Sequence, residues 1–155
     1  MICIPEWVNV TTPDIIRTNG VLAGHDGGQE VYVGKAFYTN GQSEPGKLTL
    51  DPIPTVRYGN SNIAHTSTSN IKFLNKDPNC NYQWVESSHG VDVPDAILVP
   101  QISMNLLIAR LNIHGGTQVG KVGRPPPVNR MYYGYGDKQL ESINYYEVLV
   151  CRPIN

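Results

Sequence analysis

The chain has 155 residues, a formal net charge of −1 and 16% charged residues, with neither a basic nor an acidic run. This balance excludes the electrostatic footprint by which proteins bind nucleic acids or anionic membranes. No stretch of about 20 apolar residues occurs, and the first residues lack the basic and apolar regions of a signal peptide. We therefore expect a cytoplasmic protein without membrane insertion, with non-classical export as an open alternative.

In chain order, the strongest local signals are short runs of β-branched and aromatic residues bounded by glycine, asparagine or proline. They lie at residues 30–33, 36–38, 96–99, 106–109 and 145–150. Such runs favour strands, and the 15 glycines and 12 prolines punctuate the chain in the manner of a sandwich or barrel of short antiparallel strands. No helical periodicity accompanies them. The sequence therefore predicts an all-β fold with little or no helix.

Three anchors recur in the same order along the chain, which indicates an internal repeat. The pairs are Trp7-Val8 with Trp84-Val85, Gly46-Lys47 with Gly120-Lys121, and residues 71–74 with residues 146–149. We place repeat one at residues 5–78 and repeat two at residues 79–155, within a single domain over residues 1–155. Because units of this size cannot bury an apolar face alone, we expect the tandem repeats to pack about a pseudo-two-fold axis.

Sequence patterns typical of enzymes and metalloproteins are absent. The histidines show no HExxH or HxH spacing, no GxSxG elbow or P-loop occurs, and the acidic residues are scattered singly. Cys3, Cys80 and Cys151 are odd in number, far apart and without CxxC spacing, so we expect three free thiols. These patterns predict a protein that is not an enzyme and that holds neither a metal nor a cofactor.

Asp26 and Lys47 are the best candidates for a binding site. We expect them on two turns that flank a hairpin over residues 30–38, and turns at one end of a sheet can converge. A carboxylate accepts hydrogen bonds from vicinal hydroxyls while an ammonium donates to their oxygens, which is a natural way to hold a sugar diol. The residues alone leave the alternative open that Asp26 only shapes its Asp-Gly turn and that Lys47 is a solvated surface lysine.

At these positions the chain resembles the DM-nine repeat family, also called natterin-type amino-terminal repeats, over nearly its whole length. The segments that carry the resemblance are Tyr82-Gln83-Trp84-Val85, residues 21–26 with 31–36, Pro45-Gly46-Lys47 and Tyr146-Glu147-Val148-Leu149. The resemblance implies a two-repeat, all-β lectin that binds mannose and acts as a recognition molecule in innate defence. In the family, the aspartate of an AGxD turn and the lysine of PGK hold the sugar, and these fall on Asp26 and Lys47.

Repeat two departs from the family pattern at both sugar-binding motifs. Residues 98–102 replace the AGxD turn, and Val119-Gly120-Lys121 replaces PGK. Gln101 and Lys121 then form a possible weaker second site, in which Gln101 lacks a charged acceptor. The expected partner is mannose or a mannose-containing glycan, with a possible homo-oligomer. The alternative function is a structural or partner-binding protein of the same fold that has lost sugar binding.

Overall fold

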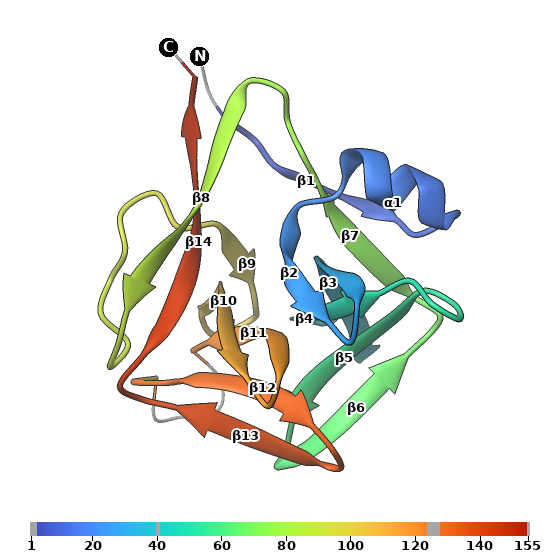
Figure 1. The fold of residues 1–155 in the computed structure, drawn as a ribbon. Helices are drawn as coiled ribbons and strands as arrows, with labels where there is room; N and C mark the ends of the chain where they lie inside the picture. The colour runs from blue at the N-terminus through green and yellow to red at the C-terminus, as the bar shows by residue number, and fades with distance from the viewer. Residues whose placement is uncertain (1–2, 40, 124–127, 155) are drawn as a thin grey trace.

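A computed structural model describes residues 3–39, 41–123 and 128–154, and nearly all of its regular structure is antiparallel strand (Figure 1). The strands of the first half are β1 (Glu6–Asn9), β2 (Leu22–Asp26), β3 (Gln29–Thr39), β4 (Gln42–Thr49), β5 (Thr55–Asn60), β6 (Ile63–Ser67) and β7 (Ile71–Asn75). Those of the second half are β8 (Cys80–Ser87), β9 (Leu98–Pro100), β10 (Asn105–Ile113), β11 (Gly116–Val122), β12 (Met131–Tyr135), β13 (Lys138–Ser142) and β14 (Tyr146–Pro153). The predicted all-β class is confirmed.

The strand order has an internal symmetry that reveals the repeat. Neighbouring strands run β1-β7-β3-β4-β5-β6-β13-β12-β11-β10-β14-β8. Each strand of the first half has its counterpart seven strands later, so the second half of this order is the first half reversed. The centre lies between β6 and β13, which pair at Ile63 and Lys138. Two tandem repeats packed about a pseudo-two-fold axis are therefore confirmed, while the boundary between residues 78 and 79 stays a prediction.

The apolar core follows the same symmetry. A central cluster takes Val21, Val31 and Val33 from the first half and packs them with Val99, Ile108 and others from the second. A second cluster belongs to the first half alone and contains buried Phe73, and a third belongs to the second half and contains buried Tyr146. Each repeat thus has a core of its own, and the shared cluster joins them, as expected when neither repeat can bury its apolar face alone.

Two local predictions differ from the structure. Residues 30–38 do not form a hairpin but lie within the single long strand β3, because β2 and β4 pair along its two edges and leave no turn in it. A short helix, α1 (Pro13–Asn19), was not predicted. Its signals are local: Pro13 stands at the first helical position, Asp14 lies in the first turn and Arg17 in the last.

Among the described residues, no helix has the length and apolar character needed to cross a membrane.

The expectation of three free thiols is wrong. The sulfur atoms of Cys3, Cys80 and Cys151 all lie within 4.8 Å of one another, and Cys3 is in disulfide contact with each of the other two. Sequence separation misled the prediction, because β8 and β14 are paired neighbours and bring Cys80 and Cys151 to the same end of one ribbon. The described amino-terminal segment begins beside the end of β14 (Figure 1).

Candidate functional site

Asp26 and Lys47 come together as the sequence predicts, although they lie on strands instead of turns. Asp26 is the last residue of β2, before a turn in which Gly27 and Gly28 have positive φ. Lys47 lies in β4, opposite Val33 of β3. The Lys47 ammonium donates to the Asp26 carboxylate and, at 3.3 Å, to the Gln118 side-chain oxygen.

The pair is accessible from solvent, but only in part. The Lys47 side chain is 12% exposed and the Asp26 side chain 34% exposed. Gln118 is buried, and its amide nitrogen donates to the Ile113 carbonyl at 3.4 Å, which fixes the orientation of the oxygen that faces Lys47. We call Asp26, Lys47 and Gln118 site 1. It contains one carboxylate, one ammonium and one amide oxygen, and it draws on both repeats.

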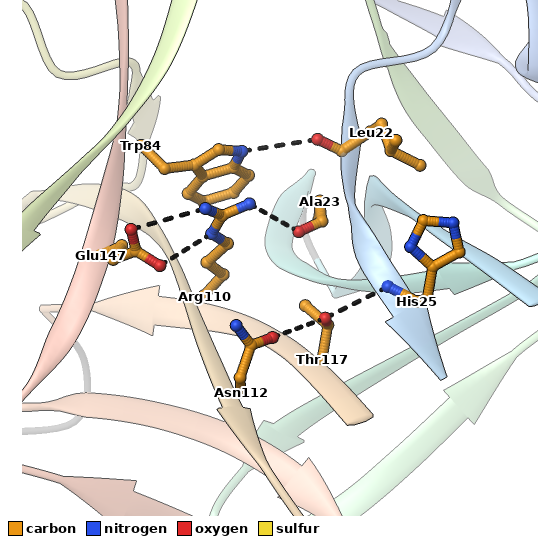
Figure 2. A network of polar contacts seen from close by, with 8 residues as sticks. All are labelled: Leu22, Ala23, His25, Trp84, Arg110, Asn112, Thr117 and Glu147. Atoms are coloured by element: carbon orange, nitrogen blue, oxygen red, sulfur yellow. Dashed lines mark hydrogen bonds and ion pairs between the residues drawn. The ribbon is translucent and has the colours of Figure 1, made fainter. Parts of the chain in front are cut away.

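The tip of β2 is held against the second repeat by specific contacts. Asp26 pairs with Gly116 of β11, and the His25 backbone N–H donates to the Thr117 hydroxyl at 3.2 Å. That hydroxyl in turn donates to the Asn112 side-chain oxygen at 2.7 Å (Figure 2). A side chain at Gly116 would collide with Asp26, since an added Cβ would lie 2.4 Å from the carboxylate carbon. Glycine at position 116 therefore leaves the space that the Asp26 carboxylate occupies.

An open cleft of about 360 Å³ adjoins site 1. It is lined by His25, Asn112, Ile113, Gly115 and Gly116. His25 precedes Asp26 in the chain and Gly116 is the register partner of Asp26, so the cleft lies beside the end of β2. The cleft has room for a small polar ligand next to site 1.

The equivalent place in repeat two has a different arrangement. Lys121 of β11 corresponds to Lys47 of β4, but the Lys121 ammonium lies 2.7 Å from the Glu44 carboxylate, and both side chains are only 2% exposed. Gln101, the counterpart of Asp26, donates from its amide nitrogen to the Ser43 backbone carbonyl. We call Gln101, Lys121 and Glu44 site 2. Sequence reasoning missed that Lys121 takes its acid from the other repeat.

Sites 1 and 2 are related by a reciprocal exchange across the pseudo-two-fold axis. Lys47 of repeat one contacts Gln118 of repeat two, and Lys121 of repeat two contacts Glu44 of repeat one. Gln118 and Glu44 each stand three residues before the lysine of their own repeat. That shared spacing is the signal from which these two residues could have been found, once the repeats are known to pack together.

A cation over a tryptophan ring marks a second pair of equivalent positions. The Arg110 guanidinium lies 4.7 Å from the ring centre of Trp84, and the Lys35 ammonium lies 4.7 Å from that of Trp7. Arg110 also pairs with Glu147 and donates to the Ala23 carbonyl at 2.8 Å, which ties the repeats together (Figure 2). Both tryptophans are partly buried against the central core cluster, as befits residues that pack between the repeats.

Lys35 has a different partner from Arg110. The residue opposite it on β7 is Lys72, where repeat two has Glu147 opposite Arg110. Burial, and then the charge of Lys72, lowers the pKa of Lys35 to about 8. At equivalent places, repeat two therefore has an ion pair, Arg110 with Glu147, whereas repeat one has two lysines of like charge.

The comparisons with known proteins agree with this architecture. The sequence model of the DM9 repeat matches residues 25–142. The crystal structure of the nematode sperm cell motility protein MFP2B has a similar fold, with a TM-score of 0.70 at 18% sequence identity. The match covers 99% of this chain and 47% of that protein, so the chain spans about half its length. No curated protein matches the sequence.

Proposed function

The chain belongs to the DM9 repeat family, and on that premise and the geometry of Asp26 and Lys47 we propose that it is a lectin that binds mannose or mannose-containing glycans at site 1. The defence role that the family resemblance implies, recognition of foreign glycans, is part of the same proposal. We infer a binding protein and not an enzyme.

The observation that carries the proposal is the partly exposed ion pair between Asp26 and Lys47. Two vicinal hydroxyls of a hexose offer two donors to a carboxylate, and their oxygens accept from an ammonium. Hydrogen bonds to a charged partner contribute about 1.5–3 kcal/mol each, more than neutral ones. A sugar diol can therefore insert between the two groups, with its hydroxyl hydrogens facing the carboxylate and its oxygens facing the ammonium. Gln118, which is buried, holds the Lys47 ammonium in place, and the adjoining cleft offers room for the rest of the ring.

The expected affinity for a single sugar is weak. One monosaccharide offers few atoms, and an open cleft leaves part of it in water, so we expect a dissociation constant on the order of 0.1–1 mM, or about −4 to −5.5 kcal/mol. Stronger attachment to a glycan surface then requires several sites at once, through self-association or dense ligands, which can raise the apparent affinity roughly 10²-fold or more.

Site 2 supports the alternative that part of the protein has a structural or partner-binding role. Lys121 and Glu44 form an ion pair in which each side chain is only 2% exposed, and the Gln101 amide donates to the Ser43 carbonyl. A sugar would have to break a buried ion pair to enter, which is costly. Should site 1 also bind no sugar, the chain would be a protein of this fold that has lost sugar binding.

A glycan array probed with the purified full chain tests the proposal. We expect binding to mannose-terminated glycans and loss of that binding in Lys47→Ala, with Lys76→Ala as a control in the same repeat but away from site 1. A folded protein that binds no glycan on the array would favour the structural or partner-binding alternative.

A further inference from the structure

The three cysteines of the chain meet at one place although they lie at positions 3, 80 and 151. On the β8–β14 ribbon, Cys80 is opposite Pro153 and Cys151 is opposite Tyr82, so the two cysteines are diagonal neighbours on one face. The segment that contains Cys3 leads into β1, which pairs with β7 of repeat one. A bond from Cys3 to either cysteine therefore joins the amino-terminal segment to repeat two.

Cys3 has two alternative partners. The Cα atoms of Cys3 and Cys80 are 5.3 Å apart, and those of Cys3 and Cys151 are 6.8 Å apart. Both separations lie in the range that disulfides span, about 4.4–6.8 Å. One sulfur atom forms only one disulfide, so the two bonds exclude each other and each leaves a thiol beside the bond that formed.

We propose that Cys3, Cys80 and Cys151 form a thiol–disulfide exchange site in which Cys3 is the shared partner and a low-molecular-weight disulfide such as glutathione disulfide is the oxidising substrate. A cleft of about 290 Å³ gives such a molecule access. Its walls include Cys3, Cys151, Pro5, Trp7, Leu98 and Pro100. Two of the three sulfur-bearing residues thus border a space open to solvent, while Cys80 is buried.

Oxidation of the site proceeds by two displacements. A thiolate at the cleft attacks one sulfur of glutathione disulfide; a mixed disulfide forms, the glutathione S–S bond breaks, and one glutathione leaves as a thiolate and takes up a proton. A second protein thiolate then attacks the protein sulfur of the mixed disulfide and releases the second glutathione. In total, two protein thiols lose two electrons and two protons, and one glutathione disulfide becomes two glutathiones.

Exchange within the site needs no further oxidant. From a Cys3–Cys80 bond, the Cys151 thiolate attacks the Cys3 sulfur, the Cys3–Cys151 bond forms, and the Cys3–Cys80 bond breaks. The electron pair leaves on the Cys80 sulfur, which takes up a proton equivalent to the one Cys151 lost. The reverse step restores the first state.

Peptide mapping of the full chain tests this proposal, because trypsin places the cysteines in separate peptides, 1–17, 77–110 and 139–155. The reduced protein is treated with glutathione disulfide, freed of it, incubated, alkylated in acid and digested for mass spectrometry. We expect two linked pairs, peptide 1–17 with 77–110 and peptide 1–17 with 139–155, each with the third cysteine alkylated. If the two bonds exchange, their ratio is an equilibrium property of the protein. We therefore expect the same ratio of the two linked pairs when cystine replaces glutathione disulfide as the oxidant.

Serine variants separate the partners. Cys151→Ser should leave only the Cys3–Cys80 link, Cys80→Ser only the Cys3–Cys151 link, and Cys3→Ser should abolish both. Four results would each overturn the proposal. They are three alkylated cysteines after oxidation, a single link in the wild-type protein, a dominant Cys80–Cys151 link, and a ratio of the two linked pairs that differs between the two oxidants. So would a tightly bound zinc or copper ion that prevents oxidation, which would make the cluster a metal site.

Discussion

Lys121 of repeat two forms its ion pair with Glu44 of repeat one, at 2.7 Å between the charged atoms and with both side chains 2% exposed. Removing one partner of a buried pair leaves the other charge without compensation, which costs about 3–5 kcal/mol. We therefore expect Lys121→Ala to lower the free energy of unfolding by that amount in urea denaturation. The double variant Glu44→Gln/Lys121→Met should recover much of the loss, because it removes both charges. A loss below about 1 kcal/mol in Lys121→Ala would contradict the burial of this pair.

Gly116 and Gly120 offer a contrast between a binding defect and a folding defect. At Gly116 the added Cβ would meet the Asp26 side chain, whereas at Gly120 it would lie 1.9 Å from the Tyr132 backbone oxygen. Rotation of the Asp26 side chain moves its carboxylate away, and a small local shift relieves its Cβ, 2.8 Å from the added atom, whereas the backbone oxygen at Gly120 cannot rotate away. We expect Gly116→Ala to weaken mannose binding by displacing the Asp26 carboxylate, with a smaller fall in melting temperature than Gly120→Ala, which should destabilise the fold. Thermal denaturation and mannose titration of both variants check this, and an unchanged affinity in Gly116→Ala would argue that the position of Asp26 is unimportant.

Lys35 provides a prediction about pH. Burial and the neighbouring Lys72 lower its pKa from 10.5 to about 8. Between about pH 8 and the unfolded-state pKa of 10.5, Lys35 therefore carries more protons in the unfolded chain than in the folded chain. The contribution of Lys35 to the free energy of unfolding rises with pH across that interval. Below pH 8 the charged lysine opposes folding. We expect Lys72→Gln to raise the pKa of Lys35 toward its ordinary value, measured by NMR titration of the side-chain carbon next to the ammonium. A wild-type Lys35 that titrates near 10.5 would refute this.

Arg110 is expected to hold the two repeats together through geometry as well as charge. Its guanidinium pairs with Glu147, donates to the Ala23 carbonyl of the other repeat and covers Trp84. Lysine keeps the charge but cannot make these planar contacts at once. We expect Arg110→Lys to lower the free energy of unfolding by about 1.5–3 kcal/mol, the value of a hydrogen bond to a charged group, in urea denaturation. Lys35→Arg, at the equivalent place where no carboxylate stands opposite, serves as the matched control and should not destabilise by a comparable amount.

The sequence allowed prediction of the fold class and the repeat, because both depend on local strand signals and on anchors that recur along the chain. It also indicated Asp26 and Lys47, since the family motifs contain both residues. The partners of Lys121 and the meeting of the cysteines were not predictable in the same way. Glu44 reaches Lys121, and Cys3 reaches Cys151, only through the packing of one repeat on the other, and no local pattern encodes that packing.

The most direct test of the account is a calorimetric titration of mannose into Asp26→Asn. The amide retains the size and backbone preferences of the aspartate but loses the charged acceptor, whose hydrogen bonds contribute about 1.5–3 kcal/mol. We therefore expect affinity to fall by at least about tenfold with the fold intact. Asp14→Asn, at an exposed acid of α1 that is not part of site 1, is the matched control and should bind as the wild type does. Lys47→Ala should lose mannose binding as well. Folded Lys121→Ala should lose less mannose affinity than Lys47→Ala. Unchanged affinity in Asp26→Asn, or a larger loss in Lys121→Ala than in Lys47→Ala, would contradict the assignment of sugar binding to site 1.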